Sequence, residues 1–381
     1  MTVAIEIWGG ITVSLIIAAF AGGAFGAALG ALPAFIFTGF MVVAGEAGNL
    51  VAGELAESGA IEEAVGTGVT GSVAFGPVFG PHVAFAGGAA AAAYAAKKGY
   101  MDTGFDYHEA KNITFALGTK PDVLIVGGAF GILGMAIRQV SAGFGMPWDP
   151  IAMGVVLSAL FHRLILGYSL IGEARKGLLN MTPFEREEMR TATAAGGAAA
   201  DGPESATDGG AVQADRLLVE PWLPHQYKWV NVAVLGLVTG ILGGYTAIMT
   251  GSPFLAFGIS AASLVFLNCG VEQIPVTHHM TLTSSTVALA AFAESGDETY
   301  IATAFDSGAA IVGGSAELAL VLAAIMGIIC ALFGELFQRV FYAHGDTHWD
   351  PPAAAIVFGT FVIAVLYFAG VLPTTVWVPI P

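Results

Sequence analysis

The chain has 381 residues, of which 56% are hydrophobic and 11% charged, whereas ordinary soluble domains carry about 25% charged residues. This composition excludes a soluble globular protein and predicts an all-α, polytopic membrane protein whose apolar side chains are solvated by lipid. The 29 acidic residues outnumber the 13 basic ones, and the net charge of -16 excludes nucleic acid as a partner.

Long apolar runs predict membrane-spanning helices in the first part of the chain, because a span needs about 20 mainly apolar residues. The runs that qualify are 8–29, 31–52, 121–141 and 149–170. A further segment, 68–96, is ambiguous because it contains Pro, Gly and His before a run of small residues.

The ambiguous segment is expected to contain a broken or re-entrant helix. Pro81 disfavours helix in the residue before it and is tolerated in a first turn, so a helix should begin near His82. About 16 residues separate that point from the charged end at Lys97, or roughly 24 Å of helix. Because a hydrocarbon core is about 30 Å thick, the N-terminus of this helix should lie inside the membrane.

A polar stretch, 172–226, divides the chain. Its middle, from Thr191 to Ala214, is rich in Ala, Gly, Asp and Glu and predicts an acidic, partly flexible linker, since it cannot form a core. A short helix should precede it, with Thr182 as the N-cap, Pro183 in the first turn and Glu185 completing a capping box.

The second part of the chain repeats the same pattern of apolar runs. Predicted spans are 230–250, 253–270, 315–341 and 352–371, and the ambiguous segment is 271–293. In this segment Pro275 precedes His278 and His279, so a second short helix should begin near His278.

Short motifs recur in the same order in both parts and indicate an internal repeat. Trp148-Asp149-Pro150 matches Trp349-Asp350-Pro351, where Asp is expected to cap a helix, Pro to occupy its first turn and Trp to lie at the membrane interface. The other matched pairs are Gly22-Gly23 with Gly243-Gly244, Pro33 with Pro253, Asn49 with Asn268, and His82 with His279.

The repeat and the basic residues together predict an orientation in the cell membrane. Each half holds five segments, and an odd number requires the second half to be inverted. If the N-terminus lies outside the cell, every basic residue except Arg138 falls on the inner side, as the positive-inside rule demands. We therefore expect both termini outside, a first transmembrane repeat at 1–171, a cytoplasmic linker at 172–226 and an inverted second repeat at 227–381.

The two short segments carry the residues expected to bind a ligand. Helix N-termini present free N–H groups and a partial positive charge, and opposed half-helices hold the substrate near the midplane in many transporters. A purely structural alternative is that the histidines bond to neighbouring helices and the hydroxyls to their own backbone. The candidate residues are Pro81, His82, His278, His279, Thr281, Thr283, Ser284 and Ser285, with Asn49, Asn268, Glu46 and Glu272 near them.

This arrangement favours a transporter or channel for a small anion or polar solute, without a cofactor and without enzymatic activity. One alternative is a non-transporting scaffold, or an oligomeric subunit that binds lipids or carotenoids. Another is a membrane-embedded metalloenzyme, for which three ligands would have to converge on one ion. Weak metal candidates form one short cluster: His344, Asp346, His348 and Asp350.

The acidic, weakly charged composition also resembles that of haloarchaeal membrane proteins, which stay hydrated in high salt. The resemblance is to a polytopic membrane protein of an uncharacterised, transporter-like family, and it implies a halophilic, archaeal source. Abundant glycine, 52 residues, suits close packing between helices and between protomers, so a homo-oligomer surrounded by membrane lipids is expected.

Overall fold

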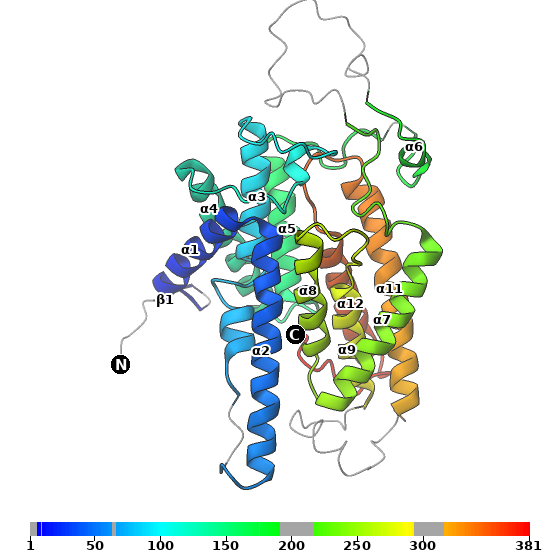
Figure 1. Cartoon of the computed structure of the whole chain (residues 1–381). Coiled ribbons are helices and arrows are strands. Elements are labelled where there is room, and N and C mark those ends of the chain that lie inside the picture. Colours follow the sequence, from blue (N-terminus) through cyan, green and yellow to red (C-terminus); the bar gives the residue numbers. More distant parts are fainter. Residues whose placement is uncertain (1–5, 9, 63–65, 175, 191–215, 293–315) are drawn as a thin grey trace, which may run out of the picture.

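The computed structural model describes residues 6–8, 10–62, 66–174, 176–190, 216–292 and 316–381 (Figure 1). Among these residues the secondary structure is helical apart from a short antiparallel hairpin of β1 (Glu6–Trp8) and β2 (Ile11–Thr12) ahead of the first helix and an isolated bridge between Met189 and Leu217. The first half contains α1 (Val13–Leu29), α2 (Ala31–Glu57), the π-helix η1 (Val69–Ala74), α3 (Ala84–Lys97), the 3-10 helix η2 (Glu109–Lys111), α4 (Pro121–Gly143) and α5 (Pro150–Ile165).

The second half follows the short helix α6 (Thr182–Glu185). It contains α7 (Trp229–Thr250), α8 (Leu255–Asn268), α9 (His278–Phe292), α11 (Ala316–Phe337), the π-helix η4 (Gln338–Tyr342) and α12 (Pro351–Phe368). A helix therefore lies in each apolar segment that the sequence singled out. Among the described residues, five helices are long and apolar enough to cross a membrane: α2, α4, α7, α11 together with η4, and α12.

The two ambiguous segments contain short helices, with 14 residues in α3 and 15 in α9. At 1.5 Å per residue, each helix is roughly 22 Å long. The chain between η1 and α3 runs through turns, in which the Val83 N–H donates to the Gly80 carbonyl. Helix α9 begins at His278 as expected, whereas α3 begins two residues later than His82.

The same pairs of helices pack together in each half. Helix α1 contacts α3 and α4, and α7 contacts α9 and α11 in the same way; α3 contacts α5, and α9 contacts α12. The halves meet where α2 packs against α8 and α5 against α12. In Figure 1, α3 occupies the upper part of the molecule and α9 the lower part.

Glycine allows the closest of these helix contacts. A Cβ atom added to Gly23 of α1 would come within 2.2 Å of the Gly127 carbonyl oxygen of α4. In the other half, a Cβ atom on Gly327 of α11 would come within 2.2 Å of the Gly236 oxygen of α7. Both pairs therefore let two backbones touch, as small residues do between membrane helices.

The segment around α6 corrects one local prediction. Thr182 is the first helical residue and not the cap, because Met181 takes the N-cap position without a side-chain hydrogen bond. The stretch Thr191–Ala214, predicted to be flexible, lies outside the described residues. Beyond it, the chain packs on the bundle: Val219 and Glu220 are buried, and the Glu220 N–H donates to the Ala343 carbonyl.

Candidate functional site

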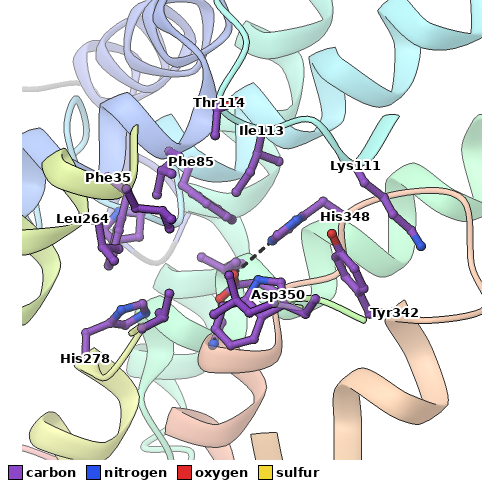
Figure 2. A pocket seen from close by; sticks show the side chains of 18 of the residues that line it. Phe35, Phe85, Lys111, Ile113, Thr114, Leu264, His278, Tyr342, His348 and Asp350 are labelled. Carbon is purple, nitrogen blue, oxygen red and sulfur yellow. Dashed lines mark hydrogen bonds and ion pairs between the residues drawn. The ribbon is translucent and has the colours of Figure 1, made fainter. Parts of the chain in front are cut away.

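A cavity of about 710 Å³ lies between the two halves of the protein (Figure 2). Its walls come from α2, α3 and α5 on one side and from α8, α9 and α12 on the other. Residues of the loop around η2 and of 217–224, ahead of α7, also line it. Because both halves build the walls, the cavity exists only where they meet.

Aromatic rings form much of the wall. Phe35 of α2 contacts Phe85 of α3 and Phe257 of α8 edge to face, at centroid distances of 6.1 and 6.0 Å. Phe75 lies 5.8 Å from Phe257 and 5.3 Å from Phe254. Trp222, Tyr342 and Trp377 also face the cavity. The walls therefore suit an apolar body, and a few polar groups interrupt them.

His278, the first residue of α9, lines the cavity and is 6% exposed. Its ring lies 4.7 Å from the ring of Phe35 and 5.8 Å from that of Phe257. Within the described residues, no hydrogen-bond partner reaches its ring nitrogens, and Nδ1 is fully buried. The Nδ1 atoms of His82 and His279, which do not line the cavity, lack a partner in the same way.

Two aspartates bring carboxylates to the cavity wall. Asp149 caps α5 by accepting a hydrogen bond from the Ile151 N–H at 2.7 Å. Asp350 caps α12 by accepting one from the Ala353 N–H, also at 2.7 Å, and its other oxygen lies 3.1 Å from His348 Nε2 (Figure 2). Both caps confirm the structural interpretation of the Trp-Asp-Pro motif.

The sequence did not predict that these caps would also line a cavity. The sequence did contain a signal for their importance, because Asp149 and Asp350 belong to the clearest repeated motif of the chain. Trp349 is buried against Phe337 and Phe341, and the membrane-interface position of the tryptophans stays a prediction.

The cavity reaches a network of buried ions at the end of the molecule near η2. Lys111 lines the cavity and forms an ion pair of 2.6 Å with Glu220, and both side chains are fully buried. Burial lowers the pKa of Lys111 to about 8, although Glu220 acts in the opposite direction. Arg216 lies 3.5 Å from Glu220 and also contacts Asp346. Lys111 thus brings little free positive charge to the cavity.

The expected histidines divide between the cavity and the interior. Pro81 and His278 line the cavity, whereas His82 and His279 do not. The ring of His82 lies against Gly80, and a Cβ on Gly134 of α4 would come within 1.7 Å of the His82 carbonyl oxygen. His279 points toward α11, where its Nε2 would lie 3.5 Å from a Cβ placed on Gly334.

The hydroxyl groups of α9 serve helix packing. Thr281 and Thr283 donate to carbonyls one turn earlier in their own helix. Ser284 donates to the Ala323 carbonyl of α11 and Ser285 to the Gly243 carbonyl of α7. Thr281 and Thr283 therefore match the structural alternative of bonding to their own backbone, whereas Ser284 and Ser285 bond to neighbouring helices. None of the four lines the cavity.

The other candidates also lie away from the cavity. Asn49 accepts from the Thr67 N–H, and Glu46 accepts from the hydroxyls of Thr70 and Ser252 at 2.6 and 2.5 Å. Asn268 and Glu272 are exposed.

Two of the weak metal candidates, His348 and Asp350, lie together on the cavity wall, 3.1 Å apart. The other two lie on separate partners, since His344 contacts the Leu178 carbonyl and Asp346 pairs with Arg216. In the part of the chain that the structure describes, no three His, Cys, Asp or Glu side chains are grouped so that they could hold a metal.

His108 gives the ion network a pH dependence that can be measured. Burial lowers its pKa from 6.5 to about 4, and its Nδ1 accepts from the Ala110 N–H. The unfolded chain takes up a proton near pH 6.5 and the folded protein does not, so stability should fall as the pH drops from about 6.5 to 4. Thermal unfolding at stepped pH values should show this decrease. His108→Asn keeps a side-chain acceptor and should flatten it; an unchanged slope in this variant would assign the effect to another group.

Comparison with known proteins identifies a family and no characterised relative. The family described as "Family of unknown function (DUF7973)" matches residues 5–381. No curated protein and no solved structure matches the chain.

Proposed function

We propose that the chain, which belongs to this family of unknown function, is an integral membrane transporter or channel whose solute binds in the cavity between its halves. The observation that carries the proposal is the cavity itself. Its volume of about 710 Å³ lies within the range of roughly 300–1,000 Å³ typical of small-molecule sites.

An inverted repeat accounts for the position of the cavity. Equivalent helices make equivalent contacts in both halves, and α3 and α9 lie toward opposite ends of the molecule (Figure 1). Residues at the same spacing in the two Trp-Asp-Pro helices line the cavity in pairs: Asp149 with Asp350, Ala152 with Ala353, and Val155 with Ile356. A site at the junction of two inverted halves is the arrangement that alternating access requires.

The proposed orientation places α6 and the ion network in the cytoplasm and both termini outside the cell. The ten segments then cross or enter the cell membrane, with α3 and α9 as half-helices that begin near its midplane. This orientation keeps the basic residues inside, as the positive-inside rule requires.

The sequence allowed a small anion or a polar solute, and the cavity favours a polar organic solute. Its aromatic walls would leave a bare inorganic ion without enough polar partners. A non-transporting scaffold would need no such cavity at the centre, whereas a subunit that binds lipids or carotenoids would use it without moving the ligand. Measurement of flux separates these roles.

The test is solute uptake into vesicles that contain the purified protein. Ala353→Phe should strongly reduce uptake, because Ala353 lines the cavity and the larger ring would project into it and obstruct it. Ala129→Phe on α4 is the matched control, since Ala129 is exposed and should keep full uptake. If a screen of polar solutes found no uptake, or if Ala353→Phe transported normally while folded, the proposal would be wrong.

A further inference from the structure

We infer that the cavity selects an organic cation, meaning an ammonium group carried on an apolar body. The inference deepens the proposed function by naming the chemical class of its solute, and it concerns binding, which can be measured without transport. It rests on the charge of the wall and on the aromatic rings that line the cavity.

The fixed charges on the cavity wall are mostly negative. Asp149 and Asp350 lie within it, while Asp106 and Glu187 line it and are exposed, so they mark its opening to solvent. Lys111 supplies positive charge among the lining residues, and its ion pair with Glu220 offsets that charge. His348 also lines the cavity beside Asp350 and offsets the charge of that carboxylate when it is protonated. A cation approaching this wall is attracted, and an anion is repelled.

Two of the helix N-termini at the cavity, those of α5 and α12, do not reverse this preference. They would attract anions if they were open. Each is already occupied by its own carboxylate, since Asp149 accepts from Ile151 and Asp350 from Ala353. The partial positive charges of both helices are therefore compensated from within the chain.

The aromatic rings of the cavity wall are the second feature that favours binding of an organic cation. Faces of Phe, Tyr and Trp attract ammonium groups, and aromatic cages recognise quaternary ammonium in particular. Phe35, Phe85 and Phe257 surround the space beside His278, with Trp222 and Trp377 also lining it. A compact metal cation would lose its hydration shell here without enough oxygen ligands to replace it.

His278 adds a polar ring to this wall. Its ring is buried and faces the cavity, and within the described residues its nitrogens have no partner. Because the ring can donate or accept a hydrogen bond, it can contact a polar group on the body of the solute.

Three small probes of matched shape test the charge preference directly. Benzyltrimethylammonium carries a permanent positive charge, neopentylbenzene is its neutral carbon isostere, and benzylsulfonate is a negative analogue. Binding to the protein in nanodiscs would be measured by calorimetry and by the fluorescence of Trp222 and Trp377, with empty nanodiscs as the background. We expect the cation to bind at least about tenfold more tightly than either analogue.

Charge-removing variants locate the site. Asp149→Asn and Asp350→Asn remove one charge each, and asparagine still caps a helix, so folding should persist. Each should weaken binding of benzyltrimethylammonium about tenfold, which corresponds to a lost contact with a charged partner. Asp102→Asn is the matched control, because Asp102 is exposed and does not line the cavity.

The outcomes separate this inference from the proposed transport. Equal or tighter binding of benzylsulfonate, no binding of the cation, or unchanged affinity in both cavity variants would overturn the inference even if vesicles took up an anion. Binding of the cation with the expected loss in the variants, but with no flux of any solute, would support the cation site and contradict the transporter.

Discussion

Replacing Gly134 with valine is expected to prevent α3 from packing and to leave the protein unable to fold. A Cβ atom at this position of α4 would lie 1.7 Å from the carbonyl oxygen of His82. Gly154 of α5 also packs closely on His82, since a Cβ placed there would lie 2.7 Å from the His82 Cβ. Overpacking backbone against backbone here should cost on the order of 4 kcal/mol or more.

Gly143→Val on the same helix is the matched control. No heavy atom lies within 4 Å of a Cβ placed at Gly143, so this variant should change stability by no more than about 0.5 kcal/mol. Thermal unfolding in detergent and the yield of monodisperse protein would measure both effects. Equal stability of the two variants would show that α3 and α4 do not pack as closely as described.

Replacing Glu220 with leucine should destabilise the protein by roughly 3–5 kcal/mol, because it leaves a buried charge without its partner. Lys111 and Glu220 are both fully buried at 2.6 Å, and Arg216 also faces Glu220. Glu220 lies in the segment ahead of α7 and Lys111 in the first half, so the pair joins the two parts of the chain. Denaturant-induced unfolding, followed by tryptophan fluorescence, would measure the decrease in the free energy of unfolding.

Two further variants make this prediction specific. Lys111→Met combined with Glu220→Leu removes both charges and should restore much of the stability, since a matched apolar pair can replace a buried ion pair. Lys176→Met removes one partner of the pair with Glu188, which is partly exposed, and should cost less than about 1 kcal/mol. A double variant no more stable than Glu220→Leu alone would contradict the ion-pair explanation.

Much of the secondary structure could be predicted because its causes are local. Apolar runs located the helices, and proline with glycine located the non-helical chain before α3 and α9. The capping roles of Asp149 and Asp350 follow from three consecutive residues, so the sequence was enough to predict them. Thr182 was misjudged because Asn180, two residues earlier, accepts from its backbone N–H and competes for the start of α6.

The candidate site was only partly predictable, because its members come from distant parts of the chain. His278 and His279 are neighbours, yet successive residues of a helix point about 100° apart. The packing of α9 therefore turns His278 toward the cavity and His279 toward α11. Likewise, Asp149 and Asp350 face one space only because α5 and α12 pack together where the halves meet.

By itself, the sequence determined that this is a helical membrane protein, which segments are helical, and which motifs recur in its two halves. Hydrophobic length and capping chemistry act within a few turns, so no knowledge of the fold was needed to read them. Only the tertiary structure decided which of these residues share a cavity, and that Lys111 is neutralised by Glu220 far along the chain. Those relations depend on how separate helices pack, which no local pattern of residues encodes.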